Sequence, residues 1–345
     1  MNEFPELIKD EKELDEVMTK PTPQLVDFMK KLKGDIIVLG IGGKMGITLG
    51  GLAVNAIKEA KISKTVYGVS RFSNPEGRKV LEDFGVKTIA CDLLDPDSVN
   101  KLPKVENVIF MAGKKFGTQG EEAMTWAMNT VVPTNVARHF KGSNILAFST
   151  GCVYPLEEIT SGGSTEERVP APIGDYAQST LGRERVFEYY SITDKTPLCL
   201  YRLNYAIDLR YGVMRDIGEN ILNDEPVDIT SSHVNVIWQG DANSQALLCL
   251  GQCKVNGNVM NITGPETLSV KWIANEFAKY FDKTPTFSGE PSERMYLNNS
   301  SYATELFGYP SVGPKLMIKW IAAWLKSGGK SLNKRTHFEV TSGKY

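Results

Sequence analysis

The sequence predicts an α/β fold in which helices cover both faces of a parallel sheet and a smaller cap follows. Three observations predict this fold. Short apolar runs alternate regularly with segments of helical periodicity between residues 35 and 204. A glycine-rich turn follows the first apolar run, and the alternation ends after about residue 205. Runs that are apolar on both faces are typical of strands buried between two helical layers.

Each element of the alternation has its own signal. Apolar runs of four to eight residues bounded by turn residues predict strands; they span 35–40, 65–72, 86–93, 107–113, 144–150 and 197–204. Apolar residues spaced three and four apart predict helices; these span about 44–60, 76–85, 119–140 and 175–191. Crossovers between parallel strands are right-handed and place ligands at the carboxyl ends of the strands.

The change of pattern along the chain predicts three parts. Residues 1–33 form a polar, helix-rich extension that is broken at Pro21 and Pro23. Residues 34–205, with about 229–262, form the sheet domain. Residues 206–228 and 263–345 form the cap and a polar tail, which includes an amphipathic helix at 320–327.

Composition excludes several classes of protein. The formal net charge of -2 gives no electrostatic reason to expect nucleic acid or an anionic membrane as a partner. No apolar stretch approaches the roughly 20 residues that cross a bilayer, and the acidic first residues lack a signal-peptide core, so we expect a cytoplasmic protein. The five scattered cysteines predict reduced thiols, and the three dispersed histidines predict no metal site.

The glycine-rich turn predicts a dinucleotide-binding site. The segment DIIVLGIGGKMGITLG places glycines at Gly40, Gly43 and Gly46 between a strand and a helix, with Gly42 as a fourth. Glycines at this spacing make the tight turn, let backbone amides reach a pyrophosphate and let the helix pack closely on the sheet. We expect Lys44 and Met45, which lie within the turn, to contact the cofactor as well.

The end of the second strand favours NADP over NAD. An acidic side chain there would bind the ribose 2′-hydroxyl of NAD. This chain has Ser70 and Arg71 instead, and a guanidinium suits the 2′-phosphate of NADP. A solvated Arg71, with NAD as the cofactor, is the alternative.

Further motifs follow in order along the chain. A DLxD-like segment begins at Asp92 and Leu93, and Ala112, Gly113, Lys114 and Lys115 follow the fourth strand. The fifth strand ends in Ser-Thr-Gly-Cys-Val-Tyr at 149–154, Tyr176 opens the next predicted helix, and Asn299 to Pro310 carries a looser C-terminal motif. From about residue 34 to 325, the chain resembles the extended short-chain dehydrogenase/reductase family, which includes the NAD-dependent epimerases and dehydratases of nucleotide sugars.

The resemblance implies a Rossmann-type fold and a set of catalytic residues. It assigns Thr150 to the substrate oxygen and Tyr176 to proton exchange with it. It adds to the cofactor site Asp92, Leu93, Ala112, Gly113, Lys115 and Tyr176. The lysine of the family's YxxxK motif is replaced by Thr180. A phenol with a pKa near 10 needs a cation nearby to act as a base near neutrality. Lys115 and Arg183 are the candidates for that cation, with Lys115 slightly favoured.

The resemblance also implies a substrate side and a partner. Candidate substrate residues are Gly151, Cys152, Asn204, Arg210 and Arg294, with Arg202 as an alternative to Asn204. The expected substrate is a sugar or nucleotide sugar, and the family commonly forms homodimers through helices corresponding to 119–140 and 175–191; a monomer stays open.

Three functions follow from these observations. The first is an epimerase, dehydratase or related oxidoreductase that works by transient hydride transfer. The second is an NADPH-dependent carbonyl reductase, which Ser70 and Arg71 suit. The third is a dinucleotide-binding regulatory protein without catalysis, which Thr180 suits.

Overall fold

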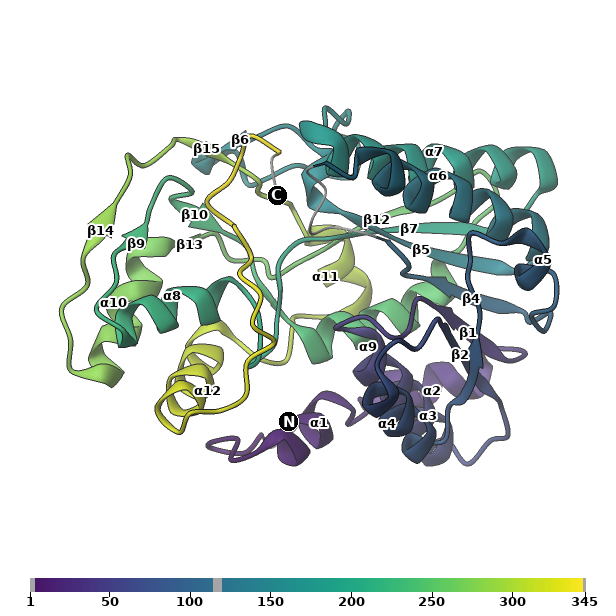
Figure 1. Cartoon of the computed structure of the whole chain (residues 1–345), viewed down its shortest axis with the longest axis horizontal. Coiled ribbons are helices and arrows are strands. Elements are labelled where there is room, and N and C mark those ends of the chain that lie inside the picture. The colour runs from purple at the N-terminus through teal and green to yellow at the C-terminus, as the bar shows by residue number, and fades with distance from the viewer. Residues whose placement is uncertain (1–3, 114–119, 344–345) are drawn as a thin grey trace.

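The computed structural model describes residues 4–113 and 120–343. Its centre is a seven-stranded parallel sheet in the order β12-β7-β5-β4-β1-β2-β3 (Figure 1). The strands are β1 (Ile36–Leu39), β2 (Val66–Ser70), β3 (Lys87–Ala90), β4 (Asn107–Phe110), β5 (Asn144–Thr150), β7 (Leu198–Leu203) and β12 (Val259–Ile262). The predicted fold class is therefore confirmed, and six of these strands coincide with the predicted runs.

Helices form a layer on each face of the sheet. One layer contains α2 (Pro23–Lys31), α3 (Gly46–Glu59), α4 (Pro75–Phe84), α9 (Gln239–Leu248) and α11 (Ser301–Phe307). The other contains α5 (Pro96–Val99), α6 (Glu122–His139) and α7 (Gly174–Asp194) (Figure 1). Strands β1, β4 and β5 are completely buried or nearly so, because both faces are covered.

The strand order reverses at the centre of the sheet. The chain runs outward from β1 to β2 and β3, then returns to β4 on the other side of β1. In such sheets the carboxyl ends of the two strands at the reversal form the crevice in which ligands bind. Here this crevice lies between the ends of β1 and β4.

The cap lies beyond the carboxyl edge of the sheet. It contains α8 (Val213–Leu222), α10 (Val270–Phe281) and α12 (Pro314–Lys326), which pack around Trp320 and Phe277. Short strand pairs surround them: β8 (Ala206–Ile207) with β11 (Ile237–Trp238), β9 (Val227–Asp228) with β14 (Phe287–Ser288), β10 (His233–Val234) with β13 (Leu268–Ser269), and β6 (Glu157–Glu158) with β15 (Arg294–Met295). The predicted helix at 320–327 is the second half of α12.

The N-terminal extension belongs to the core. Helix α1 (Glu11–Met18) buries Leu14 and Met18 in the cap, and α2 buries Leu25 and Met29 against α3 and α9. The expectation of a polar lead-in missed this packing, because the five buried apolar residues are spread over two short helices. In the described part of the chain, no helix is long and apolar enough to span a membrane. All five cysteines are free, and no group of metal-ligating side chains is found among the described residues.

Candidate active site

The glycine turn joins β1 to α3 where the strand order reverses. Gly40 has a positive φ of 90°, and a Cβ there would lie 2.6 Å from the backbone nitrogen of Ala112, at the end of β4. A Cβ on Gly46 would lie 2.1 Å from the carbonyl oxygen of Ile41. A side chain at Gly40 or Gly46 is therefore incompatible with this backbone.

The same turn fits the pyrophosphate of a dinucleotide. A Cβ on Gly43 would meet nothing closer than 3.5 Å, so the packing of the protein itself does not require glycine at this position. The amino terminus of α3 has no side-chain cap, and its first turn contains no acidic residue. Backbone N–H groups at an uncapped helix start, beside a glycine, form a site for an anion.

The residues predicted for the adenosine half lie at the ends of β2 and β3. A Cβ on Gly42 would lie 2.7 Å from the hydroxyl oxygen of Ser70, so Ser70 lies next to the turn. Arg71 is exposed, as a residue that reaches for a ribose phosphate must be. Asp92 is exposed and accepts a hydrogen bond from the backbone nitrogen of Leu94, and Leu93 is buried.

Thr150 and Tyr176 meet beyond the end of β5. Thr150 is the last residue of β5, and Tyr176 lies in the first turn of α7, which packs on that strand. The Thr150 hydroxyl forms a hydrogen bond with the Tyr176 phenol. Burial raises the pKa of Tyr176 to about 12, with Cys152 adding to the rise and with Arg183 and the Thr150 hydrogen bond opposing it. Tyr176 nonetheless keeps part of its surface accessible, because it faces a cavity.

Arg183 is a buried cation behind this pair. It is 6% exposed, and its Nη1 donates to the carbonyl oxygen of Phe148 on β5 at 2.7 Å. Its Nη2 donates to the side-chain oxygen of Asn129 on α6. Burial lowers the pKa of Arg183 to about 10, so the guanidinium is still charged at neutral pH, close enough to lower the pKa of the phenol.

Gly113 makes room for that guanidinium. A Cβ on Gly113 would lie 2.4 Å from Nη2 of Arg183, so any other residue at this position would displace the arginine. The end of β4, α6 and α7 therefore together determine where the cation lies.

Two further residues bear on the missing lysine: Thr180, which stands at its position in the motif, and Lys115, the other candidate cation. Thr180 is buried, and its hydroxyl donates to the carbonyl oxygen of Tyr176 within α7 at 2.7 Å. Its side chain therefore forms a hydrogen bond inside the helix and carries no charge that could act on the phenol. Lys115, the favoured candidate, lies outside the described residues, as does Lys114.

A cavity of about 400 Å³ joins these residues to the cap. Its sheet side includes Gly40, Gly43, Lys44, Met45, Met111, Gly113, Thr150, Cys152 and Tyr176. Its cap side includes Asn204, Tyr205, Tyr211, Gly212 and Val213, together with Lys334 and Thr336 from the C-terminal tail. The glycine turn and the Thr150–Tyr176 pair therefore open into one space, as a dinucleotide and a second ligand in contact would require.

The predicted substrate residues divide into two groups. Cys152 and Asn204 line the cavity, and Gly151 lies beside them, where a Cβ would meet the Asn298 side chain at 2.6 Å. Arg210 and Arg294 are not among the described residues that line it. Arg210 is held by Asp208 at 2.9 Å and Asp15 at 3.2 Å, and exposed Arg294 pairs with Glu158 at 2.7 Å.

Arg202 likewise bonds to residues outside the cavity. It forms two hydrogen bonds with the buried carboxylate of Glu184, at 2.8 and 2.6 Å, and a third with the hydroxyl of Tyr154 at 2.7 Å. Of the alternatives Arg202 and Asn204, only Asn204 therefore reaches the cavity.

Sequence reasoning missed several residues that line the cavity. Tyr205 and Tyr211 come from the segment after β7, where the strand pattern ends, and Tyr205 has a positive φ of 42°. Lys334 and Thr336 come from a stretch that reads only as polar tail. No local pattern identifies such residues, because they reach the cavity only when the cap has folded.

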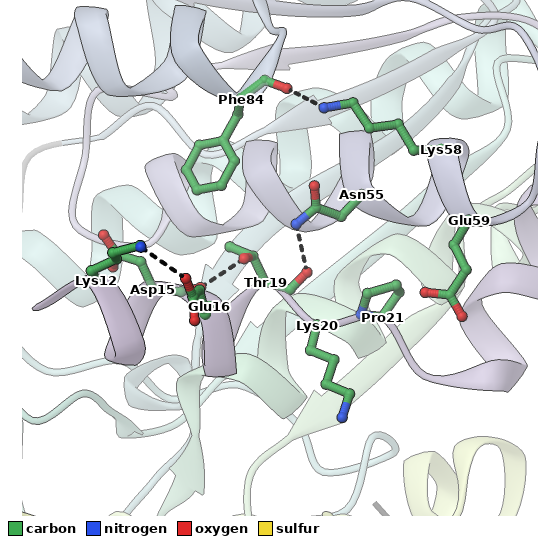
Figure 2. A pocket seen from close by; sticks show the side chains of 10 residues that line it. All are labelled: Lys12, Asp15, Glu16, Thr19, Lys20, Pro21, Asn55, Lys58, Glu59 and Phe84. Carbon is green, nitrogen blue, oxygen red and sulfur yellow. Dashed lines mark hydrogen bonds and ion pairs between the residues drawn. The ribbon is translucent and has the colours of Figure 1, made fainter. Parts of the chain in front are cut away.

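A second hollow lies between the N-terminal extension and the sheet domain. It measures about 850 Å³ and lies between α1 and the carboxyl-terminal end of α3. Figure 2 shows its lining side chains, which include Lys12, Glu16, Asn55 and Lys58. Their contacts are internal: Lys12 pairs with Glu16 at 3.8 Å, Asn55 donates to Thr19 and Lys58 to Phe84 (Figure 2). Among the described residues, none of those that line this hollow also lines the Thr150–Tyr176 cavity.

Comparison with known proteins identifies solved structures that share this fold. No protein-family model and no curated sequence matches the chain. Among solved structures, a UDP-glucose 4-epimerase from Thermotoga maritima superposes with a TM-score of 0.69 at 18% identity, covering 85% of this chain and 99% of its own. The UDP-glucose 4-epimerase of Thermus thermophilus, in complex with NAD, gives 0.69 at 17% identity, also covering 85% and 99%.

A third neighbour has a related substrate. The UDP-glucuronic acid 4-epimerase of Bacillus cereus, in complex with UDP-glucuronic acid and NAD, gives a TM-score of 0.68 at 18% identity, covering 85% and 99%. This chain therefore has the fold of the extended short-chain dehydrogenases/reductases, as the motifs implied.

Proposed function

We propose that this protein is a nicotinamide-dependent oxidoreductase of the epimerase/dehydratase type, acting on a nucleotide sugar. The observation that carries the proposal is the shared cavity, in which the Thr150–Tyr176 pair faces the glycine turn. The neighbouring folds that bind NAD and UDP-sugars support the substrate class. The cofactor, when bound, would accept a hydride from the substrate carbon and return it.

In this proposal, the residues of the chain handle the proton and the charge. Thr150 holds the substrate oxygen with a hydrogen bond, and Tyr176 exchanges a proton with it. Arg183 takes over the electrostatic role of the absent lysine, because its buried positive charge favours the phenolate. Asn129, Phe148 and Gly113 keep the guanidinium in place.

The test of the proposal is Tyr176→Phe. We expect turnover to fall by about 10²–10⁴-fold, the usual contribution of a general acid–base group, with dinucleotide affinity nearly unchanged. Steady-state rates with UDP-glucose or UDP-glucuronic acid and a dinucleotide titration measure the two effects. Tyr189→Phe is the matched control, because Tyr189 lies on the same helix and is 60% exposed. Retained activity in Tyr176→Phe would remove the assignment.

A carbonyl reductase is the second candidate. With a pKa of about 12, the Tyr176 phenol is protonated near neutral pH, which suits donation of a proton to a carbonyl oxygen. Mass spectrometry of the ligand that co-purifies with the protein distinguishes the two. A cofactor that stays bound through turnover supports the epimerase type, and one that exchanges and is consumed with a carbonyl substrate supports the reductase.

We propose that the cofactor is NADP and that the Arg71 guanidinium binds its 2′-phosphate. Ser70 beside Gly42 and the exposed position of Arg71 support this choice. Arg71→Ala should lower NADP affinity by about tenfold, the scale of one charge-assisted contact, and leave NAD affinity unchanged. Parallel titrations of both dinucleotides measure it. An unaltered preference in the variant would exclude Arg71 from cofactor choice.

We also propose a homodimer formed through α6 and α7. Large apolar side chains are exposed on both helices, including Trp126, Val131 and Ile192. Sedimentation velocity measures the oligomeric state.

A further inference from the structure

The chain after α12 crosses the cap and ends beside the active-site helix. We call residues 327–343 the C-terminal strap, which Figure 1 shows running from α12 toward β6. The backbone nitrogen of Leu332 donates to the carbonyl oxygen of Arg210, and Phe338 is buried in the cap core. At the far end, a Cβ on Gly343 would lie 2.4 Å from the carbonyl oxygen of Ile173. The strap thus spans from the cap to the start of the helix that carries Tyr176.

The middle of the strap is anchored on α8. Both the backbone nitrogen and the hydroxyl of Thr336 donate to the carboxylate of Asp216, at 2.8 and 2.6 Å. The side chain of Arg335 donates to Asn220 at 2.8 Å. Alternate residues of an extended chain face the same side, and here Lys334 and Thr336 both line the cavity. The anchor at Thr336 therefore holds Lys334 at the cavity wall.

The charge of the cavity has one sign. Of the described residues that line it, the charged ones are Lys44 and Lys334, and none is acidic. Lys44 lies in the glycine turn, and its Nζ is 3.2 Å from the centre of the Tyr211 ring on the cap side. Lys334 lies on the cap side, and within the described part of the chain its ammonium forms no hydrogen bond or ion pair. By contrast, Lys330 on the same strap pairs with Glu11 at 3.2 Å.

We propose that Lys334 is a substrate-binding residue that contacts a phosphate of the nucleotide diphosphate. The proposal rests on the proposed function for the class of substrate. A positive side chain at the wall of a cavity whose described lining contains no carboxylate favours an anionic ligand. Because the strap is fastened to α8 and the cap, Lys334 faces the substrate side and leaves the cofactor's pyrophosphate to the glycine turn. The strap, which closes the cavity from outside the sheet domain, thereby sets specificity for a charged substrate over a neutral sugar.

Calorimetric titrations of UDP, NAD and NADP into the full-length protein test this proposal without requiring turnover. Lys334→Gln should weaken UDP binding by about fivefold at low salt, the scale of one solvent-accessible ion pair, and flatten its dependence on ionic strength. Both dinucleotide affinities should be unchanged. Lys334→Arg should retain most of the UDP affinity, and Lys330→Gln is the matched control on the same strap. Thr336→Val, which removes one anchoring bond, should weaken UDP binding with Lys334 still present.

The results of these titrations distinguish a failure of the Lys334 proposal from a failure of the proposed function. Unaltered UDP affinity in Lys334→Gln, a loss confined to NAD or NADP, or absence of UDP binding by the wild type would each overturn the role of Lys334. Failure of the proposed function has a different signature, in which the protein binds UDP through Lys334 and shows no turnover of any nucleotide sugar.

Discussion

At the scale of single residues, the proposed chemistry depends on the Tyr176 phenol and on the buried guanidinium of Arg183. Burial alone moves the pKa of Tyr176 upward, away from neutrality, while Arg183 and Thr150 move it back. Arg183 holds its charge because Phe148 and Asn129 accept its hydrogen bonds, and buried charges persist only with such partners. We therefore propose that an arginine two helical turns from the tyrosine supplies the positive charge that the usual lysine supplies one turn away.

Arg183→Lys is the prediction at this scale. A lysine keeps the charge but loses the second hydrogen-bond arm and the length of the guanidinium. We expect kcat to fall by about ten- to a hundredfold, the lower range for one acid–base contribution. The acidic limb of the kcat/KM profile, along which the phenol loses its proton to become the base, should move to higher pH, because the cation that lowers the Tyr176 pKa lies farther from the phenol.

The pH profile also supplies the control. Arg185→Lys changes an exposed arginine on the same helix, whose partner is Glu188 at 2.6 Å, and should leave the profile unchanged. A pH profile of Arg183→Lys that coincides with that of the wild type would show that Arg183 is only structural.

At the scale of elements, α7 is joined to the sheet by a polar network as well as by apolar packing. Glu184, one residue after Arg183, accepts hydrogen bonds from Arg202 on β7 and from Ser149 on β5 at 2.5 Å. Burial alone would lower the pKa of Arg202, but the bonds and charge of Glu184 outweigh it and raise that pKa. The network fixes the helix that carries both Tyr176 and Arg183.

Breaking this network should destabilise the protein. Arg202→Met leaves the Glu184 carboxylate buried without its cation, which costs about 3–5 kcal/mol of unfolding free energy. Urea denaturation monitored by circular dichroism measures the loss. Arg168→Met, which removes a partner from Glu157 on the surface, should change the unfolding free energy by less than about 1 kcal/mol. Equal effects of the two substitutions would contradict the structural role of the pair.

At the scale of the whole molecule, the extension, sheet and cap fold as interlocked layers. Arg210, in the cap, binds Asp208 nearby and Asp15 of α1, so a predicted substrate residue instead joins the N-terminal extension to the cap. The strap joins the cap to α7 on the other side. Residues near the C-terminus therefore line the cavity directly, while the N-terminal extension supports the cap through Arg210.

Global stability should weaken in mild acid through His139. This buried histidine ends α6, with its Nε2 3.0 Å from the carbonyl oxygen of Leu102. Burial, and then the charge of Lys104, lower its pKa below the ordinary value of 6.5. Below pH 6.5 the unfolded chain binds the proton more readily than the folded one, so the unfolding free energy falls as the pH drops from there toward the lowered pKa.

The measurement is the unfolding free energy from neutral to mildly acidic pH for wild type and His139→Gln. The variant should show a shallower decrease, because the group that gains a proton on unfolding has been removed. His337→Gln, at an exposed position on the strap, is the control. Parallel curves for wild type and His139→Gln would exclude this histidine as a source of acid sensitivity.

Local patterns in the sequence determined the sheet, the glycine turn and the positions of Thr150 and Tyr176. Periodicity and turn chemistry depend on only a few neighbouring residues, so they can be recognised from the sequence without a structure. The fold was predicted correctly on that basis, while the contribution of α1 and α2 to the core was not, because each buries only a few apolar side chains.

Tertiary structure alone decided which cations surround the cavity. Arg183 is buried beside Gly113 only because α7 packs against the ends of β4 and β5. Arg202 and Arg210 are withdrawn into ion pairs with Glu184 and Asp15, and Lys334 arrives from the strap. Each of these contacts joins segments that are distant in sequence. The sequence alone does not predict which carboxylate, carbonyl oxygen or cavity a long arginine or lysine side chain reaches.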